Sequence, residues 1–194
     1  MSNRKDRVCP VERSGSLDNW VRRLLQNPKK ILSPYIREGM TVLEVGCGPG
    51  FFTTELAQIV GEKGRVVAVD LQEEMLQKLR EKIKGSEIEQ RIMLHKSDED
   101  RIGLSEKFDL VFLFYVVHEV PNKKAFFDEL RPLLKTDGQI YMVEPPFHVS
   151  KQDFEETIKK ANLAGLTVVE RPKLFPNKTA MLKRVNGNQY LRGS

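Results

Sequence analysis

The chain has 194 residues, of which 40% are hydrophobic and 30% charged, and these values predict one folded domain. They exclude disordered, collagen-like and disulfide-scaffold proteins. The net charge of +5 is uneven, because residues 38–170 carry 24 acidic and 17 basic side chains while residues 1–37 and 171–194 are both basic. An acidic body argues against a uniformly basic nucleic-acid binder, although a basic arm stays open.

The cysteine content and the hydrophobic runs bear on location. Two cysteines, Cys9 and Cys47, and the lack of a signal-peptide pattern predict a cytoplasmic protein with free thiols. The longest apolar run, residues 110–117, is far shorter than the roughly 20 residues that cross a bilayer, so we expect no membrane span. No cysteine or histidine has metal-ligand spacing, and no metal is expected.

Short runs rich in β-branched residues alternate with longer helix-compatible stretches over most of the chain. This alternation predicts a parallel sheet with right-handed crossover helices. Strands are expected at residues 41–45, 65–70, 92–95, 109–114 and 139–144, and helices at residues 51–60, 72–84, 123–134 and 151–164.

The two ends of the chain depart from this alternation. Residues 166–170 and 179–185 both have strand character, and the segment between them is too short for a crossover helix, so these strands should be antiparallel. We therefore expect a leader at residues 1–37, one domain at residues 38–185 and a tail at residues 186–194. The leader contains an amphipathic pattern over residues 17–33, interrupted near Pro28, which predicts a helix that serves as a lid.

The loop after the first strand carries the strongest functional signal. Gly46, Gly48 and Gly50 alternate there, directly before a helix, which lets a nucleotide-like ligand approach bare backbone. A turn without a ligand would need only one glycine. No lysine follows Gly50, and Phe51 stands where a dinucleotide loop has its third glycine. Glu44, at the end of the strand, favours a ligand with a cationic end.

Acidic residues follow the second and third strands. Asp70 ends the second strand, 20 residues beyond Gly50, where a carboxylate accepts hydrogen bonds from ribose hydroxyls. Leu71 and Met75 follow at positions suited to cover an adenine ring. Asp98, shortly after the third strand, is suited to an adenine amino group.

These motifs resemble those of the class I S-adenosylmethionine-dependent methyltransferases. The similarity is greatest to the small enzymes like those of ubiquinone and menaquinone biosynthesis, the methyltransferase type 11 group, and it covers roughly residues 30–185. The resemblance implies a Rossmann-like three-layer α/β sandwich whose seven-stranded, mostly parallel sheet ends in an antiparallel hairpin. The matching segments are residues 44–50, 67–70, 97–98, 108–111 leading to His118, and 133–139.

The resemblance also implies S-adenosyl-L-methionine as the cofactor. The glycine loop would lie against its methionine part, with the ammonium group near Glu44 and the loop carbonyls, while Leu113 and Phe114 would flank the methyl donor. The implied cofactor-binding residues are Glu44, Gly46, Cys47, Gly48, Gly50, Asp70, Leu71, Met75, Ser97, Asp98, Leu113 and Phe114.

Methyl transfer demands alignment of the acceptor and exclusion of water, and it needs a base only when the acceptor arrives protonated. The catalytic candidates are His118, Tyr115 and Glu144, which lie just past the fourth strand or at the end of the fifth. Two structural roles stay open beside catalysis. His118 would be a helix-start residue bonded to the next loop, and Glu144 with His148 would shape the substrate loop.

The chain has almost no insertion beyond the minimal fold, which favours a small-molecule acceptor. The basic ends, including Arg22 and Arg23, would frame the acceptor entrance and favour an anionic molecule. Two other functions stay open: a nucleic-acid or protein methyltransferase that uses its basic termini, and a non-catalytic S-adenosylmethionine-binding domain. No Asn-Pro-Pro-Tyr signature follows the fourth strand, which argues against methylation of nucleic-acid amino groups.

Overall fold

The computed structural model describes residues 27–185, which divide into two compact parts, one ending at Glu99 and one beginning at Asp100. It has a seven-stranded mixed sheet, parallel except at the last two strands of the chain, so the predicted fold class is confirmed. Within residues 27–185, no helix combines the length and the apolar character that a membrane crossing requires. Most of the predicted leader and the tail at residues 186–194 lie outside the described residues.

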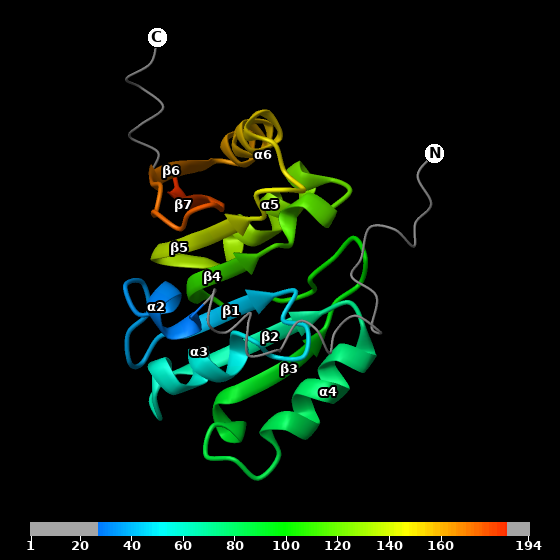
Figure 1. The fold of residues 1–194 in the computed structure, drawn as a ribbon, viewed down its shortest axis with the longest axis vertical. Helices are drawn as coiled ribbons and strands as arrows, with labels where there is room; N and C mark the ends of the chain where they lie inside the picture. The colour runs from blue at the N-terminus through cyan, green and yellow to red at the C-terminus, as the bar shows by residue number, and fades with distance from the viewer. Residues whose placement is uncertain (1–26, 186–194) are drawn as a thin grey trace. The chain divides into compact units, whose positions relative to one another are not determined.

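The first part is a three-stranded parallel sheet in the order β3-β2-β1, with its helices between the strands in sequence (Figure 1). Four residues of β1 and five of β2 are buried, as expected for parallel strands that are covered on both faces. The elements are α2 (Pro28–Leu32), β1 (Thr41–Val45), α3 (Thr53–Val60), β2 (Arg65–Asp70), α4 (Glu73–Ile83), η3 (Glu89–Arg91) and β3 (Ile92–Lys96).

Helix α4 packs its apolar side against β2 and β3. Its buried side chains recur at three- and four-residue spacing, the pattern of a helix with one apolar face. Three of the four join the residue Cys47 of the glycine loop in one core cluster, so the loop rests on the helix. The cluster consists of Cys47, Ala68, Leu76, Leu79 and Ile83.

The second part contains four strands in the order β4-β5-β7-β6 (Figure 1). β4 and β5 are parallel, whereas β7 runs antiparallel to both β5 and β6, which confirms the antiparallel ending. The elements are β4 (Phe108–Phe114), η4 (Val117–Glu119), α5 (Lys123–Leu133), β5 (Leu134–Glu144), α6 (Lys151–Leu163), β6 (Leu166–Glu170) and β7 (Lys178–Arg184).

Strand β5 begins five residues earlier than the sequence predicts. The segment from Lys135 to Gly138 is polar and contains turn-forming residues, which is why the sequence predicts a loop there. The structure instead pairs Leu134 with Phe108, and the register then shifts before Leu110 pairs with Gln139. Pairing with β4 therefore extends the strand through an irregular segment that local sequence preference would leave as a loop.

We predict that Gly50→Ala lowers the free energy of unfolding more than Gly48→Ala. Both glycines have positive φ (81° and 53°), so alanine at either position costs about 1–2 kcal/mol of backbone strain. A Cβ at Gly50 would also lie 2.3 Å from Cδ1 of the buried Leu79, while nothing lies within 4 Å of a Cβ at Gly48. This overlap should add about 1–3 kcal/mol. Urea denaturation measures the difference, and equal losses would refute the steric explanation.

Candidate functional site

The glycine loop, residues 46–50, uses all of its amide hydrogens inside the first part. Pro49 has no amide hydrogen, and every other residue of the loop donates to a neighbouring oxygen. The bonds are Gly46 N to Val69 O (2.8 Å), Cys47 N to Val69 O (3.0 Å), Gly48 N to Asp70 Oδ2 (2.8 Å) and Gly50 N to Cys47 O (3.1 Å). A phosphate-binding loop presents free amide hydrogens to its anion. This loop presents none, so its geometry opposes an anionic ligand.

Asp70 holds this loop in place from the end of β2. Its Oδ2 accepts from Gly48 N, and its Oδ1 accepts from Gln72 N at 2.9 Å. Burial raises the pKa of this carboxyl above its usual value, although the backbone hydrogen bonds from Gln72 and Gly48 oppose the shift. Each carboxylate oxygen has a second lone pair, so Asp70 retains the capacity to accept two hydroxyl hydrogen bonds from a ribose.

Glu44 is buried on β1 beneath the loop, with 4% of its surface exposed. Thr53 Oγ1, at the start of α3, donates to Glu44 Oε2 at 2.6 Å. Burial raises the pKa of Glu44 to about 8, and the charge of Asp70 adds to the shift, while Thr53 and Lys82 oppose it. Glu44 is therefore mostly protonated at neutral pH, and a cationic group beside it would favour its ionised form.

Lys82 covers the far end of the loop from α4. Its Nζ donates to Gly50 O at 3.0 Å and to Pro49 O at 3.5 Å. The ammonium group thereby satisfies two carbonyls at the turn where the loop enters α3. The two carbonyl oxygens at this turn therefore act as acceptors, with Lys82 as their partner.

The other predicted cofactor residues of the first part differ in exposure. Leu71 keeps 36% of its surface exposed, whereas Met75 is buried in the core. Ser97 is buried, and its amide donates to Asp70 O at 3.1 Å, which places it beside the second strand's end. Asp98 is exposed. Cys47 is a buried free cysteine, and burial raises the pKa of its thiol.

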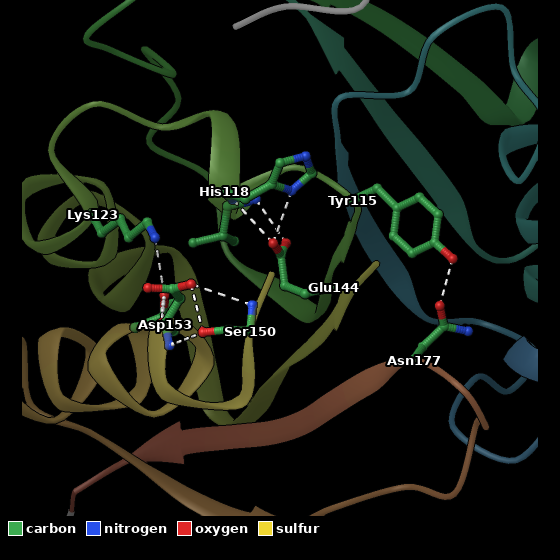
Figure 2. A network of polar contacts seen from close by, with 9 residues as sticks. Tyr115, His118, Lys123, Glu144, Ser150, Asp153 and Asn177 are labelled. Atoms are coloured by element: carbon green, nitrogen blue, oxygen red, sulfur yellow. Dashed lines mark hydrogen bonds and ion pairs between the residues drawn. The ribbon is translucent and has the colours of Figure 1, made fainter. Parts of the chain in front are cut away.

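In the second part, Glu144 and His118 form a hydrogen-bonded pair (Figure 2). Glu144 ends β5 and is buried, while the His118 side chain on η4 is 23% exposed. Glu144 Oε2 lies 2.8 Å from His118 Nδ1 and accepts from His118 N at 3.1 Å, and Oε1 accepts from Val117 N at 3.0 Å. Three nitrogen atoms therefore surround one buried carboxylate and fix its position.

This pairing decides the proton chemistry of His118. Burial lowers the pKa of its imidazole, but the hydrogen bond and the negative charge of Glu144 outweigh burial and raise it above the usual value. The contact at Nδ1 favours the tautomer that carries its proton there, which leaves Nε2 as the basic atom. The arrangement is that of a general base oriented by a carboxylate.

Tyr115 follows β4 in a backbone conformation that few residues adopt. Its φ is 62°, and it is the only non-glycine residue with positive φ among residues 27–185. Its hydroxyl group donates to Asn177 Oδ1, from the loop before β7 (Figure 2). The positive φ of Tyr115 is strained backbone, which concentrates at functional sites.

The His148 ring lies parallel to that of His118, with 6.3 Å between the ring centroids.

The structure thus collects the predicted residues into two groups. Within the first part it brings together the glycine loop, Glu44, Asp70 and Ser97, and within the second it brings together Tyr115, His118 and Glu144. Leu113 and Phe114 are buried on β4 of the second part.

Sequence reasoning missed Thr53, Lys82 and Asn177. Thr53 lies nine residues after its partner Glu44, and Lys82 lies 32 residues after Gly50. Asn177 is 62 residues from Tyr115. The sequence shows no pattern at these separations, because each contact is made by the packing of separate elements.

The chain is similar in sequence to a known protein family and to individual proteins. Residues 36–186 match the family described as "Methyltransferase domain". A demethylmenaquinone methyltransferase from Lactobacillus johnsonii is 27% identical over 182 residues, which cover 91% of this chain and 66% of that protein. One from Bacillus cereus is 28% identical over 109 residues, 56% of this chain and 46% of that protein. The chain thus matches less than two thirds of the length of either relative.

The fold has a solved counterpart. The crystal structure of a SAM-dependent methyltransferase from Aquifex aeolicus is 29% identical and superposes with a TM-score of 0.79, covering 90% of this chain and 99% of that one. Together with the family match over most of the chain, this agreement confirms the predicted family. The chain belongs to the methyltransferase domain family and has its α/β fold.

Proposed function

We propose that this chain is an S-adenosylmethionine-dependent methyltransferase that acts on a small-molecule acceptor. Its membership of the methyltransferase domain family, and the likeness to the Aquifex aeolicus methyltransferase, support the activity and the cofactor. The observation that carries the proposal is the closed glycine loop, whose amide hydrogens are all used internally. A ligand at this loop meets carbonyl oxygens and carboxyl groups.

The residues present fit the cofactor. Its methionine ammonium group is cationic, and it suits Glu44 and the loop carbonyls, while its ribose hydroxyls suit the spare lone pairs of Asp70. Leu71 is exposed enough to cover a flat ring, and Ser97 and Asp98 complete the proposed set in the first part. Met75, Leu113 and Phe114 are kept among the proposed cofactor-binding residues because the resemblance to the methyltransferase family implies them. When bound, the cofactor supplies an electrophilic methyl group on a sulfonium.

The second part supplies the residues proposed for the acceptor. His118 Nε2 removes a proton from the acceptor, and Glu144 holds the ring and stabilises the imidazolium that forms. The Tyr115 hydroxyl, held by Asn177, orients the acceptor. The chain's own contribution is to align the acceptor, since in-line displacement depends on geometry.

Support for a small-molecule acceptor comes from the two relatives named for demethylmenaquinone, which makes demethylmenaquinone the first acceptor to assay. An anionic acceptor stays a prediction, as does a cytoplasmic location. Arg171 is paired with Glu155 at 2.9 and 3.0 Å, so it is less available to an anion than the sequence suggests. Arg22 and Arg23 lie outside the described residues.

Replacement of the proposed ribose ligand tests the cofactor assignment. We expect Asp70→Ala to weaken binding of S-adenosylmethionine by about 10–100-fold, because hydrogen bonds to a charged group contribute about 1.5–3 kcal/mol. Isothermal titration calorimetry measures the affinity. Asp128→Ala, the same change at an exposed acid of α5, is the control and should bind as the unmodified chain does. Unchanged affinity in Asp70→Ala would contradict the ribose assignment.

Cofactor binding should release a proton from Glu44. The pKa of Glu44 in the free protein is about 8, so at pH 7 the group is protonated, and an ammonium group beside it lowers that pKa. Binding therefore strengthens as pH rises from 6 to 7, by up to about tenfold per pH unit. Calorimetry at pH 7 in buffers of different ionisation enthalpy should report release of about one proton.

The matched variant is Glu44→Gln, which keeps the size of the side chain but has no proton to release. It should bind the cofactor more weakly and with an affinity that stays flat between pH 6 and 7. If the unmodified chain releases no proton, or if the variant keeps the pH dependence, Glu44 does not meet the ammonium group.

The His118 proposal predicts a specific pH profile. We expect His118→Asn to lower kcat for demethylmenaquinone by about 10²–10⁴-fold, with cofactor affinity unchanged. In the unmodified chain kcat rises with pH through the pKa of His118, because the neutral imidazole is the base. Glu144→Gln removes the charge that raises this pKa, so the midpoint should move to lower pH. His95→Asn, on β3, serves as the control, and a full-rate His118→Asn would exclude a base role.

A further inference from the structure

Two phenylalanines of the second part stand almost wholly in solvent. Phe147 is 92% exposed and Phe175 is 97% exposed, more than any other large apolar residue among residues 27–185. Single exposed apolar residues are common on protein surfaces and need no explanation. These two, however, come from neighbouring loops, and we call these two loops, residues 145–149 and 171–177, the aromatic face.

The sheet brings the two loops together. Glu144, which ends β5, pairs with Lys178, which begins β7, so residues 145–149 and residues 171–177 leave the same end of this strand pair. Lys178 Nζ then crosses to the neighbouring loop and donates to Pro146 O at 3.4 Å. Phe147 follows the end of β5 by three residues, and Phe175 precedes the start of β7 by three residues.

Hydrogen bonds hold each loop at its base, so neither phenylalanine lies on an unsupported segment. Val149 N donates to Pro145 O at 3.3 Å, and Ser150 and Asp153 form a capping box that starts α6 directly after this loop (Figure 2). In the second loop, Asn177 N donates to Leu174 O at 2.8 Å, and the Thr179 hydroxyl donates to Pro172 O. The loops that carry the rings are therefore already ordered, so binding of a partner costs little further conformational entropy.

The two loops of the aromatic face carry basic side chains and no acidic ones. Residues 145–150 and 171–178 contain no Asp or Glu, and no acidic residue occurs after Glu170 in the sequence. Glu155 from α6 faces Arg171 and neutralises it. Lys173 lies two residues before Phe175 in the sequence and Lys178 three residues after it, and the exposed His148 lies between Phe147 and the capping box.

The area of the aromatic face decides which partner it fits. A stable protein interface buries about 800 Å² on each side. Two phenylalanine side chains supply about 300–500 Å² together, which is too little. Insertion into a bilayer needs only that the rings enter the boundary between headgroups and acyl chains while nearby lysines contact anionic headgroups.

We propose that the aromatic face docks this chain onto the surface of an anionic lipid bilayer, with Phe147 and Phe175 inserted and Lys173 and Lys178 at the headgroups. The inference rests on the loops of the second part and not on methyl transfer. The result of its test therefore does not depend on whether the proposed methyltransferase activity is correct.

Vesicle sedimentation of the full chain tests this. The chain should bind vesicles of phosphatidylglycerol and phosphatidylcholine more tightly than vesicles of phosphatidylcholine alone. Phe147→Ser and Phe175→Ser should each lower the partition coefficient about tenfold, because each removes one inserted ring. Lys173→Ser should weaken binding to the anionic vesicles only.

Leu163→Ser is the matched control, since Leu163 is exposed at the other end of α6 and should not contact the bilayer. All of these side chains are exposed, so thermal unfolding should be unchanged, and this is measured alongside. The proposal is overturned if the unmodified chain does not bind the anionic vesicles, or if both phenylalanine variants bind as it does. It is also overturned if Phe147→Ser with Phe175→Ser turns a dimer into a monomer in sedimentation equilibrium, which would make the face a contact between copies.

Discussion

A buried carboxylate at the end of a parallel strand must find hydrogen-bond donors, and this constraint shapes both parts of the molecule. Asp70 ends β2 and accepts from Gly48, in the loop after the adjacent strand β1. Glu144 ends β5 and accepts from Val117 and His118, in the segment after the adjacent strand β4. In each case the backbone supplies the donors because an unpaired buried carboxylate would be far too costly. The loops take the shapes that this pairing dictates.

The pairing of a buried carboxylate with backbone amides has different chemical consequences in the two parts. In the first part it consumes an amide hydrogen of the glycine loop, so the loop offers oxygen atoms to a ligand. In the second part the carboxylate also meets an imidazole nitrogen, which fixes the His118 ring and raises its pKa. The same kind of pairing thus uses up a loop amide hydrogen in the first part and orients an imidazole ring in the second.

Glu44 differs from these two carboxylates in its partners. Among residues 27–185 its side-chain hydrogen bond comes from the hydroxyl of Thr53, and burial raises its pKa to about 8. Asp70 and Glu144 are held by several backbone donors that belong to the fold. The pKa of Glu44 instead lies within about one unit of neutral pH, so a cationic ligand changes its protonation state easily.

The sequence by itself determined the strand and helix pattern, the reversed ending and the glycine loop, because these depend on periodicity and on local spacing. The roles of Asp70 and Glu44 toward a ligand stay predictions from the sequence. It placed the start of β5 too late, since pairing with β4 overrides the polar segment from Lys135 to Gly138. Only the tertiary structure decided that Glu144 holds His118, that Asn177 holds Tyr115 and that the loops carrying Phe147 and Phe175 leave the same end of the β5 and β7 pair. These contacts join residues that are distant in the chain, and they form only when strand pairing sets which ends of which strands are neighbours.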